Sequence, residues 1–267
     1  MPLPVSLETI WSNMSRILAL SSSRSGNGGY LETALPYIKE FLGDKKGRVA
    51  FIPFASVDRD YDHYLSMVQE GLASLSLDIV LVNEENAATV LKGSDVIMVG
   101  GGNTFKLLHD LYSLALLEII QEKIKTGTPY IGWSAGANIA GRSIATTNDM
   151  PIVQPAGFSA LGFLPFQVNP HYLNQQPEGF HGETRDQRLT EFIRMNPGAT
   201  VVGLPEGTAL VREGKDLRYL GTVPAVLFQM GEGGSPLRRE LLPGEDLSFL
   251  ITPASGSSPE ALASRDR

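Results

Sequence analysis

Short apolar runs alternate with segments of helical spacing over the first half of the chain. Such runs are typical of parallel strands that are buried on both faces of a sheet, and the alternation is typical of strand-helix units. The apolar runs lie at 16–20, 49–53, 77–82 and 95–99, and helices are expected at 31–42, 61–75 and 87–92. The sequence therefore predicts the α/β class, with a mostly parallel sheet flanked by helices.

The rest of the chain extends this pattern without dividing it. A strand is expected at 199–204, a hairpin at 210–220, and further strands at 225–230 and 247–251. There is no internal repeat and no linker strong enough to split the chain. We expect a loose leader at 1–15, a single α/β domain at 16–252, and a disordered tail at 253–267, where Ser, Pro, Ala and Gly dominate.

The net charge and the absence of cysteine exclude several kinds of partner and site. The chain has 22 basic and 29 acidic residues, a net charge of −7, and no basic cluster, which argues against nucleic acid or an anionic membrane as a partner. The absence of cysteine excludes disulfides, thiolate metal sites and a cysteine nucleophile. No secretory signal or stretch of membrane-spanning length is recognisable, so a cytoplasmic location is expected.

Ser134 stands in a stretch that predicts a strand, a sharp turn and a helix. An apolar run at 130–133 leads to the serine, which lies between Gly132 and Gly136, and small residues follow from Ala135. Glycines on both sides permit a strained corner that would expose the hydroxyl beside the N–H groups of a helix N-terminus. Ser134 is thus a candidate nucleophile, although an ordinary turn of small residues gives the same pattern.

Three glycines at 100–102 end the preceding strand in a second turn. The helix after them is expected to run to about residue 124 and to end at Gly127. If the two strands are neighbours, both turns lie at one sheet edge, and an N–H of Gly101 or Gly102 could join that of Ala135 as an oxyanion hole. Close helix packing or a phosphate-binding turn are the alternatives, but neither dinucleotide nor P-loop spacing is present.

A serine nucleophile needs a base, and the chain has four histidines. His63 and His109 fall on predicted helices, where surface or packing roles are expected. His171 follows a short strand and Pro170, whereas His181 lies in a glycine-flanked turn. His171 is therefore the stronger candidate.

A carboxylate should orient the far nitrogen of the histidine. Glu206 follows a buried strand, which should hold its backbone rigidly at the sheet edge. Asp149 lies in a polar loop, where aspartate often forms turns or caps. We prefer Glu206, but the sequence leaves the choice open.

Taken together, several motifs resemble the peptidase E family of α-aspartyl dipeptidases, over about residues 17–230. They are Gly-Gly-Gly-Asn-Thr-Phe at 100–105, Tyr-Ile-Gly-Trp-Ser-Ala-Gly-Ala-Asn at 130–138, Thr-Thr-Asn-Asp-Met-Pro-Ile-Val at 146–153, Asn-Pro-His at 169–171, Gly-Glu-Thr-Arg at 182–185 and Gly-Leu-Pro-Glu-Gly at 203–207. Their order and spacing match together, which makes the resemblance specific.

The resemblance implies a sandwich like that of class I glutamine amidotransferases, which is flavodoxin-like, and a serine dipeptidase that acts on Asp-X without metal or cofactor. It implies Ser134 as nucleophile and His171 as base, with Asp149 or Glu206 as the third member. Arg185 is expected to bind the substrate's β-carboxylate, since a guanidinium pairs with it bidentately.

Other assignments stay open beside this one. Arg188 is the rival of Arg185, and Asn103 is a further substrate-binding candidate. The expected partner is a small acidic dipeptide, with a homodimer as an open alternative. A cyanophycinase-like peptidase acting on an acidic polymer and a nucleotide- or anion-binding module without enzymatic activity are the other functions considered.

Overall fold

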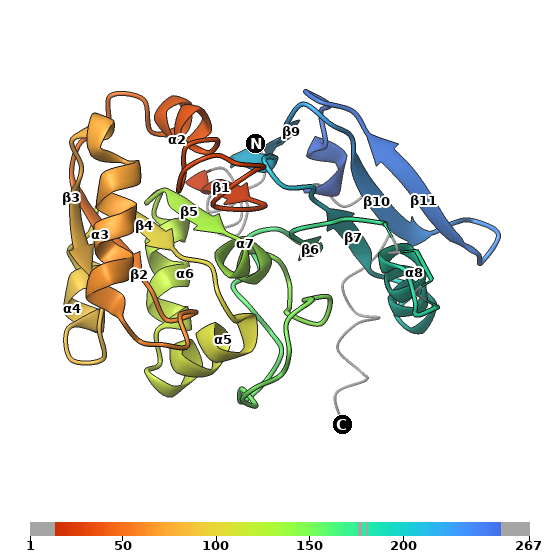
Figure 1. Cartoon of the computed structure of the whole chain (residues 1–267), viewed down its shortest axis with the longest axis horizontal. Coiled ribbons are helices and arrows are strands. Elements are labelled where there is room, and N and C mark those ends of the chain that lie inside the picture. Colours follow the sequence, from red (N-terminus) through yellow and green to blue (C-terminus); the bar gives the residue numbers. More distant parts are fainter. Residues whose placement is uncertain (1–13, 176–177, 180, 252–267) are drawn as a thin grey trace, which may run out of the picture.

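The computed structural model describes residues 14–175, 178–179 and 181–251, and their strands form two sheets (Figure 1). The expected leader lies outside these residues except for positions 14–15, and the expected tail lies outside them entirely. The first sheet has seven strands in the order β3-β2-β4-β5-β1-β8-β9. These are β1 Arg16–Leu20, β2 Arg48–Ile52, β3 Asp78–Leu81, β4 Val96–Val99, β5 Tyr130–Trp133, β8 Ala209–Glu213 and β9 Asp216–Leu220.

The strands β3, β2, β4, β5 and β1 are parallel to one another, whereas β8 and β9 form an antiparallel hairpin that joins the sheet beside β1. The predicted α/β class with a mostly parallel sheet is therefore confirmed. Strands β4 and β5 are neighbours, so the turns that follow them meet at one edge, as the sequence pattern indicates.

Both faces of the first sheet are covered, which explains the continuous apolar runs. Alternate residues of β1 enter two different cores: Ile17 and Ala19 pack on one side, and Leu18 and Leu20 on the other. One face is covered by α2 Leu35–Leu42 and α3 Tyr61–Gly71, with the short 3₁₀ helix η1 Ala73–Leu75 after it, and the other by α4 Ala87–Lys92, α5 Thr104–Ser113, α6 Leu117–Lys125 and α7 Ala135–Ala140.

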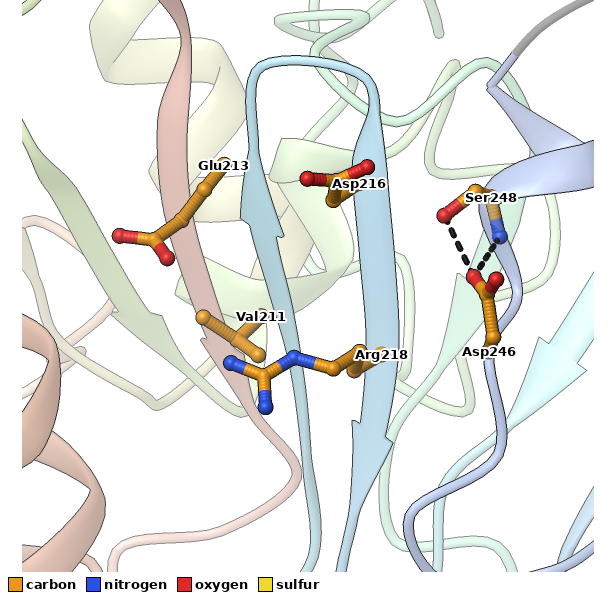
Figure 2. A pocket seen from close by; sticks show the side chains of 6 residues that line it. All are labelled: Val211, Glu213, Asp216, Arg218, Asp246 and Ser248. Carbon is orange, nitrogen blue, oxygen red and sulfur yellow. Dashed lines mark hydrogen bonds between the residues drawn. The ribbon is translucent and has the colours of Figure 1, made fainter.

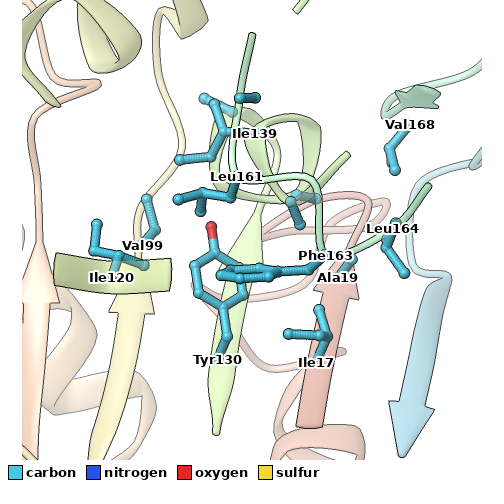
Figure 3. Packing of buried hydrophobic residues seen from close by; sticks show 14 of the residues in the cluster. Ile17, Ala19, Val99, Ile120, Tyr130, Ile139, Leu161, Phe163, Leu164 and Val168 are labelled. Atoms are coloured by element: carbon cyan, nitrogen blue, oxygen red, sulfur yellow. The ribbon is translucent and has the colours of Figure 1, made fainter. Parts of the chain in front are cut away.

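The core beneath α7 fixes the start of that helix. The rings of Tyr130 and Phe163 pack with centroids 5.7 Å apart, and Ile139 and Leu161 lie above them (Figure 3). The hydroxyl of Tyr130 is fully buried and donates to the carbonyl of Gly136 at 2.7 Å. Strand β5 and the first turn of α7 are thereby joined at a point close to Ser134.

A second, four-stranded sheet extends the molecule beyond the single sheet expected from the sequence, and it lies at the right in Figure 1. Its order is β11-β10-β7-β6, and α8 packs on it over a small core of its own. The elements are β6 Gln167–Asn169, β7 Thr200–Gly203, β10 Ala225–Met230, β11 Pro236–Leu241 and α8 Arg185–Met195. Strand β11 was not predicted, because three of its six residues are charged and four are exposed.

Three expected elements differ from the structure. The helix after the triple glycine is two helices, α5 and α6, because Ala115 adopts φ 53° between them. The helix expected from residue 31 begins at Leu35, since Leu31 has φ 58° and is not helical. The strand expected at 247–251 is instead the 3₁₀ helix η2 Ser248–Leu250. No helix among the described residues combines the length and the apolar character needed to span a membrane.

Candidate active site

Ser134 occupies a strained corner between β5 and α7. Its backbone has φ 54° and ψ −112°, a conformation that non-glycine residues rarely adopt, and its N–H donates to the carbonyl of Leu20 at 3.1 Å. A Cβ on Gly132 would lie 2.4 Å from the carbonyl oxygen of Gly136, and one on Gly136 would lie 2.2 Å from that of Val99. Both glycines are therefore required by close backbone packing around the corner.

The hydroxyl of Ser134 contacts His171, which follows a strand of the second sheet. The imidazole Nε2 lies 2.8 Å from Ser134 Oγ, and Nδ1 lies 2.8 Å from Glu206 Oε1. His171 follows β6 and Pro170, and Glu206 follows β7, which is the parallel neighbour of β6. Their side chains are 42% and 53% exposed, so the serine-histidine-glutamate chain is open to solvent.

Asp149, the other carboxylate candidate, has a different partner. Its Oδ2 accepts from the backbone N–H of Thr104 at 2.7 Å, at the start of α5. An aspartate at a helix N-terminus satisfies an N–H that has no partner within the helix. Asp149 therefore bonds to the start of α5, after the turn that follows β4, whereas Glu206 is the carboxylate that contacts His171 Nδ1.

The triple-glycine turn packs directly against the serine corner. A Cβ on Gly101 would lie 2.9 Å from Ser134 Cβ and 3.4 Å from its Oγ. Gly102 has φ 136°, and a Cβ there would lie 2.3 Å from the carbonyl oxygen of Ala55. The hydroxyl of Tyr64 donates to the carbonyl of Gly101 at 3.0 Å, and burial raises the pKa of that hydroxyl, which keeps it protonated.

A cavity of about 500 Å³ opens beside Ser134 and His171. Its walls include the glycine turn and the first turn of α3, together with the loop that follows β2. Tyr64, His63 and this loop carry no sequence signal that sets them apart from ordinary packing or surface residues, so sequence reasoning missed them as site residues. The lining residues are Ser23, Tyr30, Ala55, Ser56, Val57, Asp58, Asp60, His63, Tyr64, Met67, Gly101, Gly102, Asn103, Ser134 and His171.

Asn103 lies in the wall of this cavity, but its side chain is engaged by protein partners. Its Oδ1 accepts from the N–H of Lys106 at 3.0 Å as the N-cap of α5, and its Nδ2 donates to the carbonyl of Met150 at 2.9 Å. These bonds use the carboxamide to fix the glycine turn and the loop around residue 150.

The two arginine candidates have different surroundings, and neither lines the cavity. Arg185 is half-buried at the start of α8, and its Nη1 donates to Asn169 Oδ1 at 3.1 Å. Asn169 lies two residues before His171 in the chain. Burial, with the nearby positive charge of Arg188, lowers the pKa of its guanidinium. Arg188 is exposed, and its Nε lies 3.8 Å from the carboxylate of Glu183.

A second cavity, of about 340 Å³, lies over the hairpin of β8 and β9 (Figure 2). Asp246 accepts there from the N–H of Ser248 at 2.9 Å, and Arg218 lies beside Val211. No three His, Asp or Glu side chains converge as a metal site anywhere in the described part of the chain. The hydroxyl of Ser248 donates to Asp246 Oδ1 at 2.5 Å, but the described residues of this lining include no histidine and no cluster of metal ligands.

Comparison with known proteins gives consistent results. The sequence profile of peptidase family S51 matches residues 17–220. Peptidase E of Shewanella oneidensis is 48% identical over 235 residues, covering 88% of this chain and 98% of the relative. Peptidase E of Pasteurella multocida is 49% identical over 217 residues, covering 80% of this chain and 93% of the relative.

Two solved structures share the fold. A putative peptidase E protein from Listeria monocytogenes EGD-e superposes with a TM-score of 0.55 at 25% identity, covering 86% of this chain and 100% of that chain. A peptidase from an acI-B1 actinobacterium superposes with a TM-score of 0.62 at 18% identity, covering 88% and 97%. The likeness agrees with a flavodoxin-like α/β fold.

Proposed function

This chain belongs to peptidase family S51 and is a serine-type peptidase, and from that premise we propose that it hydrolyses dipeptides with an N-terminal aspartate. The observation that carries the proposal is the chain of contacts from Ser134 Oγ through His171 to Glu206, with both links at 2.8 Å. The cavity beside these residues leaves Ser134 and His171 open to the scissile peptide bond of a substrate.

Ser134 is the nucleophile in this proposal. Its Oγ attacks the carbonyl carbon of the scissile peptide bond while His171 Nε2 takes the hydroxyl proton. The carbonyl oxygen becomes an oxyanion, which the N–H of Ala135 and an N–H of Gly101 or Gly102 stabilise. His171 then returns the proton to the leaving amine, the C–N bond breaks, and an aspartyl ester remains on Ser134.

Water completes the cycle by the same route in reverse. His171 takes a proton from a water molecule, the resulting hydroxide attacks the ester carbonyl, and the proton returns to Ser134 Oγ as free aspartate leaves. Glu206 accepts the Nδ1 proton of His171, which sets the tautomer and stabilises the imidazolium that forms twice in the cycle. The contact of Asp149 with Thr104 supports Glu206 rather than Asp149 in this role.

Arg185 is proposed to bind the β-carboxylate of the substrate. Its guanidinium is half-buried and bonded to Asn169 close to the His171 turn, whereas Arg188 is exposed and pairs with Glu183. A partly desolvated guanidinium binds a carboxylate more strongly than an exposed one, because water screens it less. Asn103 contributes to the cavity wall through a side chain that is already engaged.

Hydrolysis of Asp-Leu and of aspartyl p-nitroanilide by single variants tests the proposal. Ser134→Ala and His171→Ala should each lower kcat by about 1,000-fold or more, because the nucleophile and its base act as one unit. His109→Ala is the matched control, since His109 lies on α5, contacts the carbonyl of Gln154 and is outside the site. Full activity in Ser134→Ala, or a wild-type chain that cleaves Ala-Leu as well as Asp-Leu, would contradict the proposal.

A further inference from the structure

Three consecutive residues, Leu20 at the end of β1 and the two serines after it, each bond to one of the turns that carry Ser134, His171 and Glu206. Leu20 accepts from the N–H of Ser134 at 3.1 Å. The hydroxyl of Ser21 accepts from the N–H of His171 at 2.9 Å, and the hydroxyl of Ser22 accepts from the N–H of Gly207 at 3.1 Å. The end of β1 thus contacts the nucleophile within its own sheet, and the two serines after it contact the histidine and glutamate turns of the other sheet.

The hydroxyl of Ser21 makes two bonds across the junction of the sheets. Besides accepting from His171, it donates to the carbonyl of Leu204 at 2.7 Å, directly after β7. Ser21 is completely buried, so no solvent molecule replaces these partners if the hydroxyl is lost. His171 has φ 51°, an uncommon conformation for a residue with a Cβ, and the bond to its N–H holds it there.

Ser22 acts on the turn that carries Glu206. Gly207 has φ 78°, its N–H bonds to Ser22, and the N–H of Ser21 donates to the carbonyl of Thr208 at 2.9 Å. The carboxylate of Glu206 is about half exposed, so its position depends on its backbone more than on packing of its side chain. Two bonds from β1 therefore fix the two residues that follow Glu206.

We propose that Ser21 and Ser22 are positioning residues, which dock the His171 and Glu206 turns of the second sheet onto the Ser134 strand of the first. They act through the backbone and do not line the cavity. This inference rests on the proposed roles of Ser134, His171 and Glu206. A loss of these bonds shifts the base relative to the nucleophile, and misplacement of about 1 Å lowers a rate by about 100-fold.

Ser21→Ala tests the proposal against Ser94→Ala. Ser94 is also buried, and its hydroxyl donates to the carbonyl of Leu91 at 2.8 Å, at the end of α4 and away from the site. Both variants lose a buried hydroxyl, so both should lower the thermal midpoint. Only Ser21→Ala should lower kcat on aspartyl p-nitroanilide, by about 10- to 100-fold with KM within about threefold. A kcat within twofold of the wild type in Ser21→Ala would overturn the proposal.

A double-variant cycle gives a second test that does not depend on Ser21→Ala folding. Ser22→Ala alone should lower kcat by about 3- to 10-fold. It should cost nothing further in the background of Glu206→Ala, because the contact with His171 that Ser22 positions is already lost there. Equal losses in both backgrounds would overturn the role of Ser22. If the wild type is active, Ser134→Ala is inactive, and both Ser21→Ala and Ser22→Ala keep full activity, only the positioning role is rejected. Full activity in Ser134→Ala would instead reject the proposed function, and the positioning role with it.

Discussion

The Nε2 of His171 lies 2.8 Å from the Oγ of Ser134, although the two residues follow strands of different sheets. Each adopts a left-handed backbone conformation, with φ 51° at the histidine and φ 54° at the serine. Such conformations persist only where the surroundings hold them, and here the glycine packing and the end of β1 do so. The chemistry of the site therefore depends on the junction between the sheets.

Glu206→Ala and Asp149→Ala should affect different properties. Loss of Glu206 removes the carboxylate from His171 Nδ1, and since that carboxylate is half exposed we expect kcat to fall by about 10- to 100-fold, less than for a buried one. Loss of Asp149 removes a bond at the start of α5 and should cost about 1 kcal/mol of stability with kcat within about threefold. Steady-state kinetics with urea unfolding of both variants would separate them, and the reverse pattern would assign the orienting role to Asp149.

Gly101→Ala should nearly abolish hydrolysis. The new Cβ would lie 2.9 Å from Ser134 Cβ and 3.3 Å from Trp133 Cδ1, so the glycine turn must move away from the serine. An oxyanion-hole donor displaced in this way costs about 100-fold or more in kcat. Gly198→Ala is the matched control, because a Cβ there meets nothing within 4 Å. Similar kinetics for the two variants would show that the glycine turn is not part of the catalytic machinery.

Arg185→Ala should lose activity selectively. On Asp-Leu we expect kcat/KM to fall by about 100-fold, since the β-carboxylate loses a charge-assisted partner, while the low activity on Ala-Leu should change little. Arg188→Ala should stay within about threefold on both substrates, because Arg188 is exposed and pairs at 3.8 Å with Glu183. An equal loss on both dipeptides in Arg185→Ala would indicate a structural role, and a selective loss in Arg188→Ala would exchange the assignments.

Asp110→Ala should lower the free energy of unfolding more than Asp78→Ala does. Asp110 accepts from Lys106 Nζ at 2.8 Å, and the same ammonium donates to the carbonyl of Phe54 before the loop of the cavity wall. Both side chains are almost buried, so the variant leaves a charge without its ion partner and should cost about 3 kcal/mol in urea unfolding. Asp78→Ala breaks an exposed pair with Arg48 at 3.5 Å and should cost at most about 1 kcal/mol. Equal costs would contradict this account of the pair.

Much of the fold was predictable because burial on both faces leaves a clear pattern. The apolar runs of β1, β2, β3, β4 and β5 show this pattern. The corner at Ser134 was predictable from a different signal, the glycines on both sides of the serine. The break at Ala115 was not predictable, since apolar spacing continues through it from α5 into α6. Strand β11 was missed because an edge strand with exposed arginines resembles a loop.

The site was predictable as a set of residue types rather than as a geometry. Asn-Pro-His after a strand indicated His171, but the choice between Glu206 and Asp149 depends on which turn each occupies in space. The contribution of Ser21 and Ser22 could not be predicted, because serines in a glycine-rich stretch are typical of a loop, and only the second sheet gives their hydroxyls partners. The cytoplasmic location, the domain limits and a homodimer stay predictions.

Mass spectrometry of the protein after reaction with a diphenyl phosphonate analogue of aspartate tests the central claim most directly. Attack by an activated serine displaces phenol and leaves a stable phosphonyl ester, which peptide mapping locates. The account predicts one adduct, on the peptide that contains Ser134, with its formation slowed by about 100-fold or more in His171→Ala. An adduct on another residue, or equally fast labelling in His171→Ala, would contradict it.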